Sequence, residues 1–238
     1  MTKTTWDTSE LLTYCSKQYT DDAAIYFKAL QQKIKRIHFS KKEIEKSPKF
    51  PFPDFDINNK SDKHKFLKPG LLILTHTESI AHNLHSLPDV LAHIINVIIL
   101  DPLGSRLESR QINIKKIIDI NNRLQNNSSL ESWRKQYYND IVDAINNLLN
   151  CCEYKYIDAF VNTIKHRHLI DSKWTFKKSP ENIISDWQFI EFERDNTLYP
   201  STTITKLIND DQEKIINIFC EVGEKINNYC RADSITNK

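Results

Sequence analysis

The chain has 238 residues and a formal net charge of only +2. That length allows one sizeable hydrophobic core or at most two small ones. Three glycines in the whole sequence leave little material for the tight turns of an all-β fold, and they exclude a glycine-rich phosphate loop. The many Ile, Leu, Lys, Glu and Asn residues predict a mostly helical domain instead.

The cysteines and the N-terminal sequence indicate a reducing compartment. The five cysteines are odd in number and form no CxxC pattern, and the first residues show no signal peptide. We therefore expect reduced thiols and a cytoplasmic protein.

The first third of the chain predicts one long helix followed by a loop. Apolar residues at three-and-four spacing favour a helix from about Ser9 to Lys46, broken at most once. Prolines at four positions predict a loop from Ser47 to Pro69. From Lys28 to Lys68 there are twelve Lys or Arg residues against five Asp or Glu. This excess indicates contact with nucleic acid or, as is more common, a solvated basic face.

A second long helix is predicted from Gly70 to Leu100, with a kink at Pro88. One side of it is broadly apolar, and the other is a narrow polar stripe without Lys or Arg from 69 to 105. Such a stripe is typical of a surface covered by another helix, another subunit or a ligand, and it has too many polar groups to face lipid. Its candidate binding residues are His82, His85, Asp89, His93 and Asn96.

The histidines of this stripe do not predict a metal site. His82 and His93 lie about 16 Å apart at about 1.5 Å per residue, so they cannot reach one ion together with the residues between them. A buried polar interface is the more common explanation of such a stripe, and we expect neither a metal nor a cofactor.

The second half of the chain predicts further helices and one β-arm. Helical periodicity appears at about 112–124, 130–150 and 154–170, and a last helix begins at Thr203 or Thr205. Alternating residues predict a small β-hairpin or β-arm at about 171–200, and the tail 231–238 is expected to be loose. The fold class is therefore all-α: a bundle of four to six helices in a single domain, 1–238, with the arm as its only sheet.

The helix predicted at 154–170 combines an apolar face with a cluster of chemically capable side chains. Imidazole suits general acid/base work, and Lys or Arg suits phosphate, so the cluster would suit metal-independent cleavage of RNA. The alternative is a cation-rich helix C-terminus, which the helix dipole favours in any case. The candidate catalytic residues are Asn162, Lys165, His166, Arg167 and His168.

Three segments resemble the HEPN superfamily, specifically its Cthe-2314-like group. They are LHSLPDVLAHIIN (84–96), FVNTIKHRHLI (160–170) and QFIEFERDNTLYP (188–200). The resemblance implies a helical bundle that usually dimerises through its long helices. Many superfamily members are RNA-cutting toxins or components of anti-phage and stress systems. The superfamily's nuclease motif, an Arg followed four to six residues later by a His, is absent, and its nearest substitute is Asn162 with His166.

Three hypotheses follow for the function. The chain is a metal-independent ribonuclease with an altered motif, a catalytically silent domain that binds nucleic acid or nucleotide, or an interaction subunit with a protein partner. RNA and a second copy of the chain are the other expected partners. We also predict that Asp89 or a stripe histidine hydrogen-bonds to a polar residue within 162–168. The alternative is that the two polar surfaces both face water.

Overall fold

The computed structural model describes residues 6–15, 17–47, 60–166, 169–178 and 183–236. The described chain is mostly helical with small antiparallel sheets, which confirms the predicted helical class. It forms two compact units. Unit 1 comprises Met1–Lys33, Ser86–Cys151 and Lys214–Lys238, and unit 2 comprises Ile34–His85 and Cys152–Glu213. That both belong to one domain, as expected for residues 1–238, stays a prediction.

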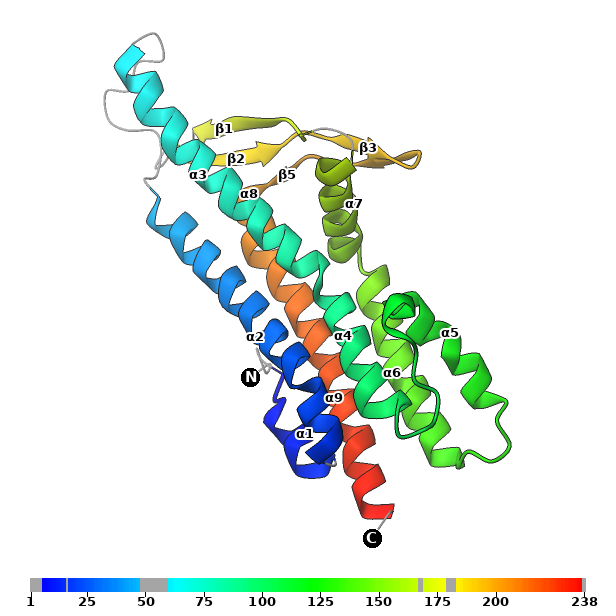
Figure 1. The fold of residues 1–238 in the computed structure, drawn as a ribbon. Coiled ribbons are helices and arrows are strands. Elements are labelled where there is room, and N and C mark those ends of the chain that lie inside the picture. Colours follow the sequence, from blue (N-terminus) through cyan, green and yellow to red (C-terminus); the bar gives the residue numbers. More distant parts are fainter. Residues whose placement is uncertain (1–5, 16, 48–59, 167–168, 179–182, 237–238) are drawn as a thin grey trace. The chain divides into compact units, whose positions relative to one another are not determined.

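Unit 1 is built from helices. Its buried side chains include Leu91, Ile95, Ile141 and Val222, and the hydroxyl of Tyr138 joins α6 to α5 by donating to a backbone carbonyl at 2.8 Å. Its elements are α1 (Ser9–Tyr14), the first part of α2 (Lys17–Lys46), α4 (Leu87–Ile95), the π-helical turn η1 (Asn96–Leu100), the 3-10 turn η2 (Ser109–Gln111), α5 (Ile114–Gln125), α6 (Ser132–Asn150) and most of α9 (Gln212–Thr236) (Figure 1).

Both long helices predicted for the first half of the chain are divided. The first is interrupted at Cys15, whose backbone is extended. The second ends at His85, and α4 begins at Leu87. Pro88 therefore lies in the first turn of α4, where a missing backbone N–H costs no hydrogen bond. The predicted kink is a helix boundary.

Unit 2 combines helices with all the strands of the described chain. The side chain of Thr203 caps α8 by accepting from the backbone N–H of Lys206 at 3.2 Å. Thr203 is one of the two threonines at which the last helix is expected to begin. Its elements are the rest of α2, α3 (Lys60–His85), α7 (Cys152–His166), α8 (Ile204–Lys206), η3 (Leu207–Asp211), β1 (Ser172–Lys178), β2 (Ile183–Phe189), β3 (Phe192–Arg194), β4 (Thr197–Tyr199) and β5 (Thr202–Thr203).

The strands confirm the arm predicted at 171–200. β1, β2 and β5 form an antiparallel sheet in which Trp174 lies opposite Trp187, and β3 pairs with β4 in a second hairpin. The turn of that hairpin places Asp195 and Asn196 at φ 51° and 61°, a left-handed pair that two-residue hairpins favour.

Aromatic packing fixes α7 against these strands. The fully buried ring of Phe160 lies with its centroid 4.7 Å from that of Phe189 on β2. Tyr156, one turn earlier, contacts the ring of Phe192 on β3 at 5.5 Å. Figure 1 shows the strands beside the end of α7. Since α7 supplies several candidate site residues, this packing positions the site.

Two predicted loops are shorter than expected. The loop predicted for 47–69 ends early, because α3 begins at Lys60 and runs through Pro69; proline keeps a helical φ and removes only one donor. Residues 48–59 lie outside the described chain. The tail predicted as loose is helical to Thr236, because Arg231 pairs with Glu10 and Asp233 pairs with Arg134 at 2.7 Å.

Within the described residues, one stretch, Leu67–Leu100, is long and apolar enough to cross a membrane by length and composition alone. Of its most apolar window, 78% is buried inside the protein. Burial of this kind is typical of a core helix in a soluble protein, so the stretch is weak evidence for a membrane span.

Candidate functional site

The candidate site lies in unit 2, where the C-terminal end of α3 meets α7 and the β3–β4 hairpin. His85 is the last residue of α3. Asp158 and Asn162 are four residues apart on α7, so they lie on one face of that helix. Arg194 is the last residue of β3. These four side chains form a connected polar cluster.

A histidine and a carboxylate are the centre of the cluster. His85 Nε2 lies 3.1 Å from Asp158 Oδ1. The amide Nδ2 of Asn162 donates to the same carboxylate oxygen at 3.0 Å and lies 3.3 Å from His85 Nε2. When Nε2 bears the imidazole hydrogen it donates to Asp158, and the neutral ring then has Nδ1 as its acceptor.

Two further residues hold the pair in place. Arg194 donates from NH1 to the backbone carbonyl of Asp158 at 3.0 Å, and the same nitrogen lies 3.8 Å from the carboxylate Oδ2. The hydroxyl of Tyr154 donates to the backbone carbonyl of His85 at 3.0 Å. The side chains of His85, Asp158 and Arg194 remain 17%, 45% and 23% exposed, so a solute reaches the carboxylate more easily than the ring.

The electrostatics of the cluster favour an ionised Asp158. The hydrogen bond from His85 is the main reason that the pKa of the Asp158 carboxyl is lowered, although partial burial opposes the shift. The charges of His85 and Arg194 and the Asn162 amide lower this pKa further. Asp158 is therefore an anion at neutral pH and acts as a fixed acceptor for His85.

The neighbouring imidazole of His82 favours its neutral form. Partial burial lowers the pKa of His82, and the positive charge of Lys165 and the charge of His85 lower it further. Lys165 and His166, at the end of α7, are both exposed. Arg167 and His168 lie outside the described residues.

The predicted contact between the polar stripe and residues 162–168 is found between His85 and Asn162.

The remaining stripe residues belong to unit 1, and each has another environment. Asp89 is exposed, so the polar stripe is not covered at this position within the described chain. His93 stacks on Tyr26 with ring centroids 4.6 Å apart. Asn96 is buried and closes the following loop by accepting from the backbone N–H of Leu107 at 2.7 Å and donating to its carbonyl at 3.2 Å. Asn96 therefore has a structural role.

Sequence reasoning missed Asp158 and Arg194. Asp158 has a detectable signal, because it precedes Asn162 by one helical turn on the face where the other polar residues lie. Arg194 has none, since only the hairpin turn at Asp195 and Asn196 brings its side chain to α7.

No group of three or more His, Cys, Asp or Glu side chains in the described residues is arranged to hold a metal ion.

The sequence matches no family model, and no match is found among curated proteins or solved structures.

Proposed function

We propose that this protein is a HEPN-like helical-bundle protein that acts on RNA as a metal-independent ribonuclease. The observation that supports this most is the His85–Asp158 pair, with Nε2 and Oδ1 at 3.1 Å. A carboxylate that accepts from one imidazole nitrogen fixes the tautomer and leaves the other nitrogen able to take a proton. His85 is then the general base.

The reaction that suits this arrangement is attack by a ribose 2′-hydroxyl. Nδ1 of His85 takes the hydroxyl proton while the 2′-oxygen forms a bond to phosphorus and the bond from phosphorus to the 5′-oxygen breaks. A protonated imidazole returns a proton to the leaving oxygen, and His166, exposed on α7, is our candidate for this acid. The products are a 2′,3′-cyclic phosphate and a free 5′-hydroxyl.

Cations near the pair supply phosphate binding. Lys165 is exposed at the end of α7, and its charge acts on His82. Arg194 presents a guanidinium whose fork of donors matches phosphate oxygens. In the same unit, α2 exposes Lys35, Arg36 and Lys42, which would attract an RNA backbone through counterion release.

The resemblance to HEPN proteins supports the same proposal. Asn162 and His166 lie four residues apart on α7, a spacing within that of the superfamily's Arg-and-His motif. The arginine of the superfamily motif is missing from the helix, and Arg194, bonded to α7 from β3, would provide a cation from another element. A cytoplasmic homodimer is the expected form of the protein.

Cleavage of single-stranded RNA in EDTA tests the assignment. The wild-type protein should cut, and His85→Gln should lower the rate by roughly 100-fold or more, the usual scale for a general acid/base. His38→Gln is the matched control, because His38 is an exposed histidine on α2 of the same unit. Equal loss in both variants, or no loss in His85→Gln, contradicts the role of His85.

One observation favours a second candidate, a catalytically silent domain that binds nucleic acid, nucleotide or a protein. The Nε2 atom of His85 and the amide of Asn162 are both already engaged by Asp158, and a satisfied cluster of this kind also serves simply to join α3 to α7. The same assay separates the two functions. A binding domain gives no product, and its affinity for RNA falls steeply with salt.

A further inference from the structure

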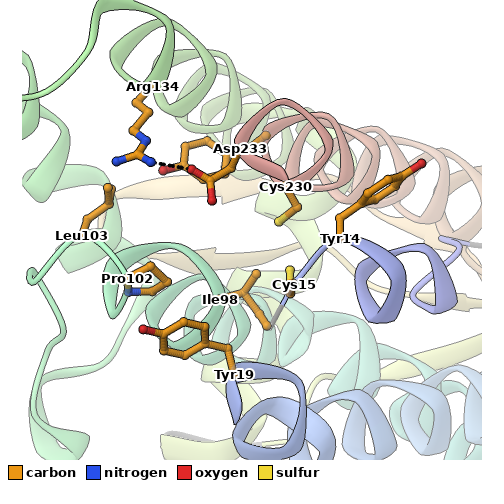
Figure 2. Close-up of a pocket in the computed structure, with 10 residues that line it drawn as sticks. Tyr14, Cys15, Tyr19, Ile98, Pro102, Leu103, Arg134, Cys230 and Asp233 are labelled. Atoms are coloured by element: carbon orange, nitrogen blue, oxygen red, sulfur yellow. Dashed lines mark hydrogen bonds and ion pairs between the residues drawn. The ribbon is translucent and has the colours of Figure 1, made fainter. Parts of the chain in front are cut away.

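A cavity in unit 1 brings two cysteines together. It has a volume of about 190 Å³ and is lined by Cys15, Cys230, Arg134, Asp233, Tyr14 and Tyr229, among others. Cys15 lies at the junction between α1 and α2, and Cys230 lies on α9. Figure 2 shows the two sulfur atoms turned toward each other, with Arg134 and Asp233 on another wall.

The two thiols are free and differ in their surroundings. Cys15 is partly exposed and Cys230 is buried. A hydrogen bond joins the two thiols. It lowers the pKa of the Cys15 thiol and raises the pKa of the Cys230 thiol. Burial and the charge of Asp233 oppose the shift at Cys15. Cys15 is therefore the sulfur with the larger thiolate fraction, and the Cys230 thiol is its donor.

The backbones that bear the two sulfurs are held side by side. Trp6 Nε1 donates to Asn227 Oδ1 at 3.0 Å, and Asn227 Nδ2 donates to Glu10 Oε2 at 2.7 Å. Glu10 also pairs with Arg231, which directly follows Cys230. These contacts anchor the segment before Cys15 to α9, so joining the sulfurs requires little movement of the chain.

The cavity suits a small oxidant. Its volume of about 190 Å³ corresponds to about six water molecules at roughly 30 Å³ each, and a hydroperoxide fits this space more readily than a bulky disulfide. The guanidinium of Arg134 forms an ion pair with Asp233 at 2.7 Å, while its buried Nε has no hydrogen-bond partner in the described chain. The ion pair of Arg134 with Asp233 gives this part of the cavity lining a polar character.

We propose that Cys15 and Cys230 form a hydroperoxide-reactive dithiol that closes to a disulfide. The Cys15 thiolate attacks one oxygen of hydrogen peroxide, the O–O bond breaks, and the products are Cys15 sulfenic acid and hydroxide. Cys230 then attacks the Cys15 sulfur, and the displaced hydroxide takes the Cys230 proton to form water. Two electrons pass from the two sulfurs to the peroxide.

The oxidation of Cys15 favours the attack by Cys230 that follows it. The hydrogen bond to the Cys15 thiolate is the main reason that Cys230 keeps its proton, and this thiolate no longer exists once Cys15 is a sulfenic acid. The attacking and resolving roles are assigned by exposure, since Cys15 is partly exposed and Cys230 is buried in α9.

Peroxide treatment of the full-length protein tests the proposal. After stoichiometric hydrogen peroxide and alkylation, the wild-type protein should carry two fewer alkyl groups than the protein alkylated without peroxide, and peptide mapping should identify a Cys15–Cys230 link. Cys15 should react at least about tenfold faster than the exposed Cys152, since reactivity follows thiolate fraction. Oxidised glutathione should produce the link far more slowly. Peroxide that oxidises Cys152 while Cys15 and Cys230 stay thiols overturns the proposal.

Variants then test the order of attack. Cys230→Ala should leave a Cys15 sulfenic acid that a dimedone probe traps, whereas Cys15→Ala should leave Cys230 as a thiol. Cys152→Ala is the matched control and should still form the link. A dimedone adduct on Cys230 in Cys15→Ala would contradict the assigned roles. The wild-type mapping does not depend on any variant folding.

Discussion

His85 Nε2 lies 3.1 Å from Asp158 Oδ1, and this contact links the last residue of α3 to α7 in unit 2. Asn162 shares the same carboxylate oxygen at 3.0 Å, and Arg194 bonds to the backbone of Asp158. A histidine whose one nitrogen is fixed by a carboxylate is suited to proton transfer, and nearby cations are suited to phosphate.

Removing the charge of Asp158 should impair both catalysis and stability. Asp158→Asn no longer fixes the His85 tautomer, so we expect RNA cleavage to fall by roughly 100-fold. Because the pKa of Asp158 is lowered in the folded state, its contribution to stability is present above about pH 4, the unfolded value, and is lost as the pH falls through the folded value. The free energy of unfolding of the variant should thus lie below that of the wild type at pH 7.

Urea unfolding at several pH values measures this difference. The gap between wild type and Asp158→Asn should shrink as the pH is lowered below about 4. A gap that is equally large at pH 7 and at low pH would mean that packing at this position, and not charge, determines the loss.

His93 should make unit 1 sensitive to mild acid. Its ring stacks on Tyr26 at 4.6 Å, its buried Nδ1 has no hydrogen-bond partner in the described chain, and burial lowers its pKa against the opposing charge of Asp89. A histidine with a lowered folded pKa stabilises the fold above its unfolded pKa of about 6.5, and this stability is lost as the pH falls.

His93→Phe keeps a ring on Tyr26 but cannot take a proton. Between pH 7.5 and 5.5, roughly one unit either side of that unfolded pKa, the urea midpoint of the wild type should fall more than that of the variant. If the urea midpoints of the wild type and of His93→Phe fall equally between these two pH values, His93 does not titrate differently in the folded and unfolded states.

Truncating the aromatic core behind the site should destabilise unit 2. Phe160 is fully buried and packs on Phe189 at 4.7 Å, so Phe160→Ala should lower the free energy of unfolding by about 3–5 kcal/mol. Lys155→Ala, at an exposed position of the same helix, should change it by less than about 0.5 kcal/mol. A similar small change in both variants would contradict the packing of α7 on the strands.

Much of the fold could be predicted from periodicity alone. The apolar spacing identified the helices now seen as α2, α5, α6, α7 and α9, and the alternation at 171–200 identified the strands. Helix boundaries were harder. Lys60–Pro69 is helical although a proline inside a helix removes a hydrogen bond and crowds the preceding turn. The end of α9 is fixed by the long-range pairs of Arg231 and Asp233.

Only part of the candidate site could be predicted from the sequence, because the helix that bears the polar stripe is divided. A stripe of polar residues shares one surface only while the helix is continuous, and this helix ends at His85. Asp89, His93 and Asn96 therefore belong to unit 1, whereas His85 meets Asn162 in unit 2. The contact of Arg194 with Asp158 depends on the β3–β4 hairpin, and no local sequence pattern encodes where that hairpin packs.

The central claim is tested most directly by offering the wild-type protein two oligonucleotides of one sequence in EDTA, one RNA and one fully 2′-O-methylated. The account predicts that the RNA is cut to products ending in a 2′,3′-cyclic phosphate, while the methylated strand stays intact because it has no 2′-hydroxyl for His85 to deprotonate. Cleavage of both strands, or of neither, would contradict it.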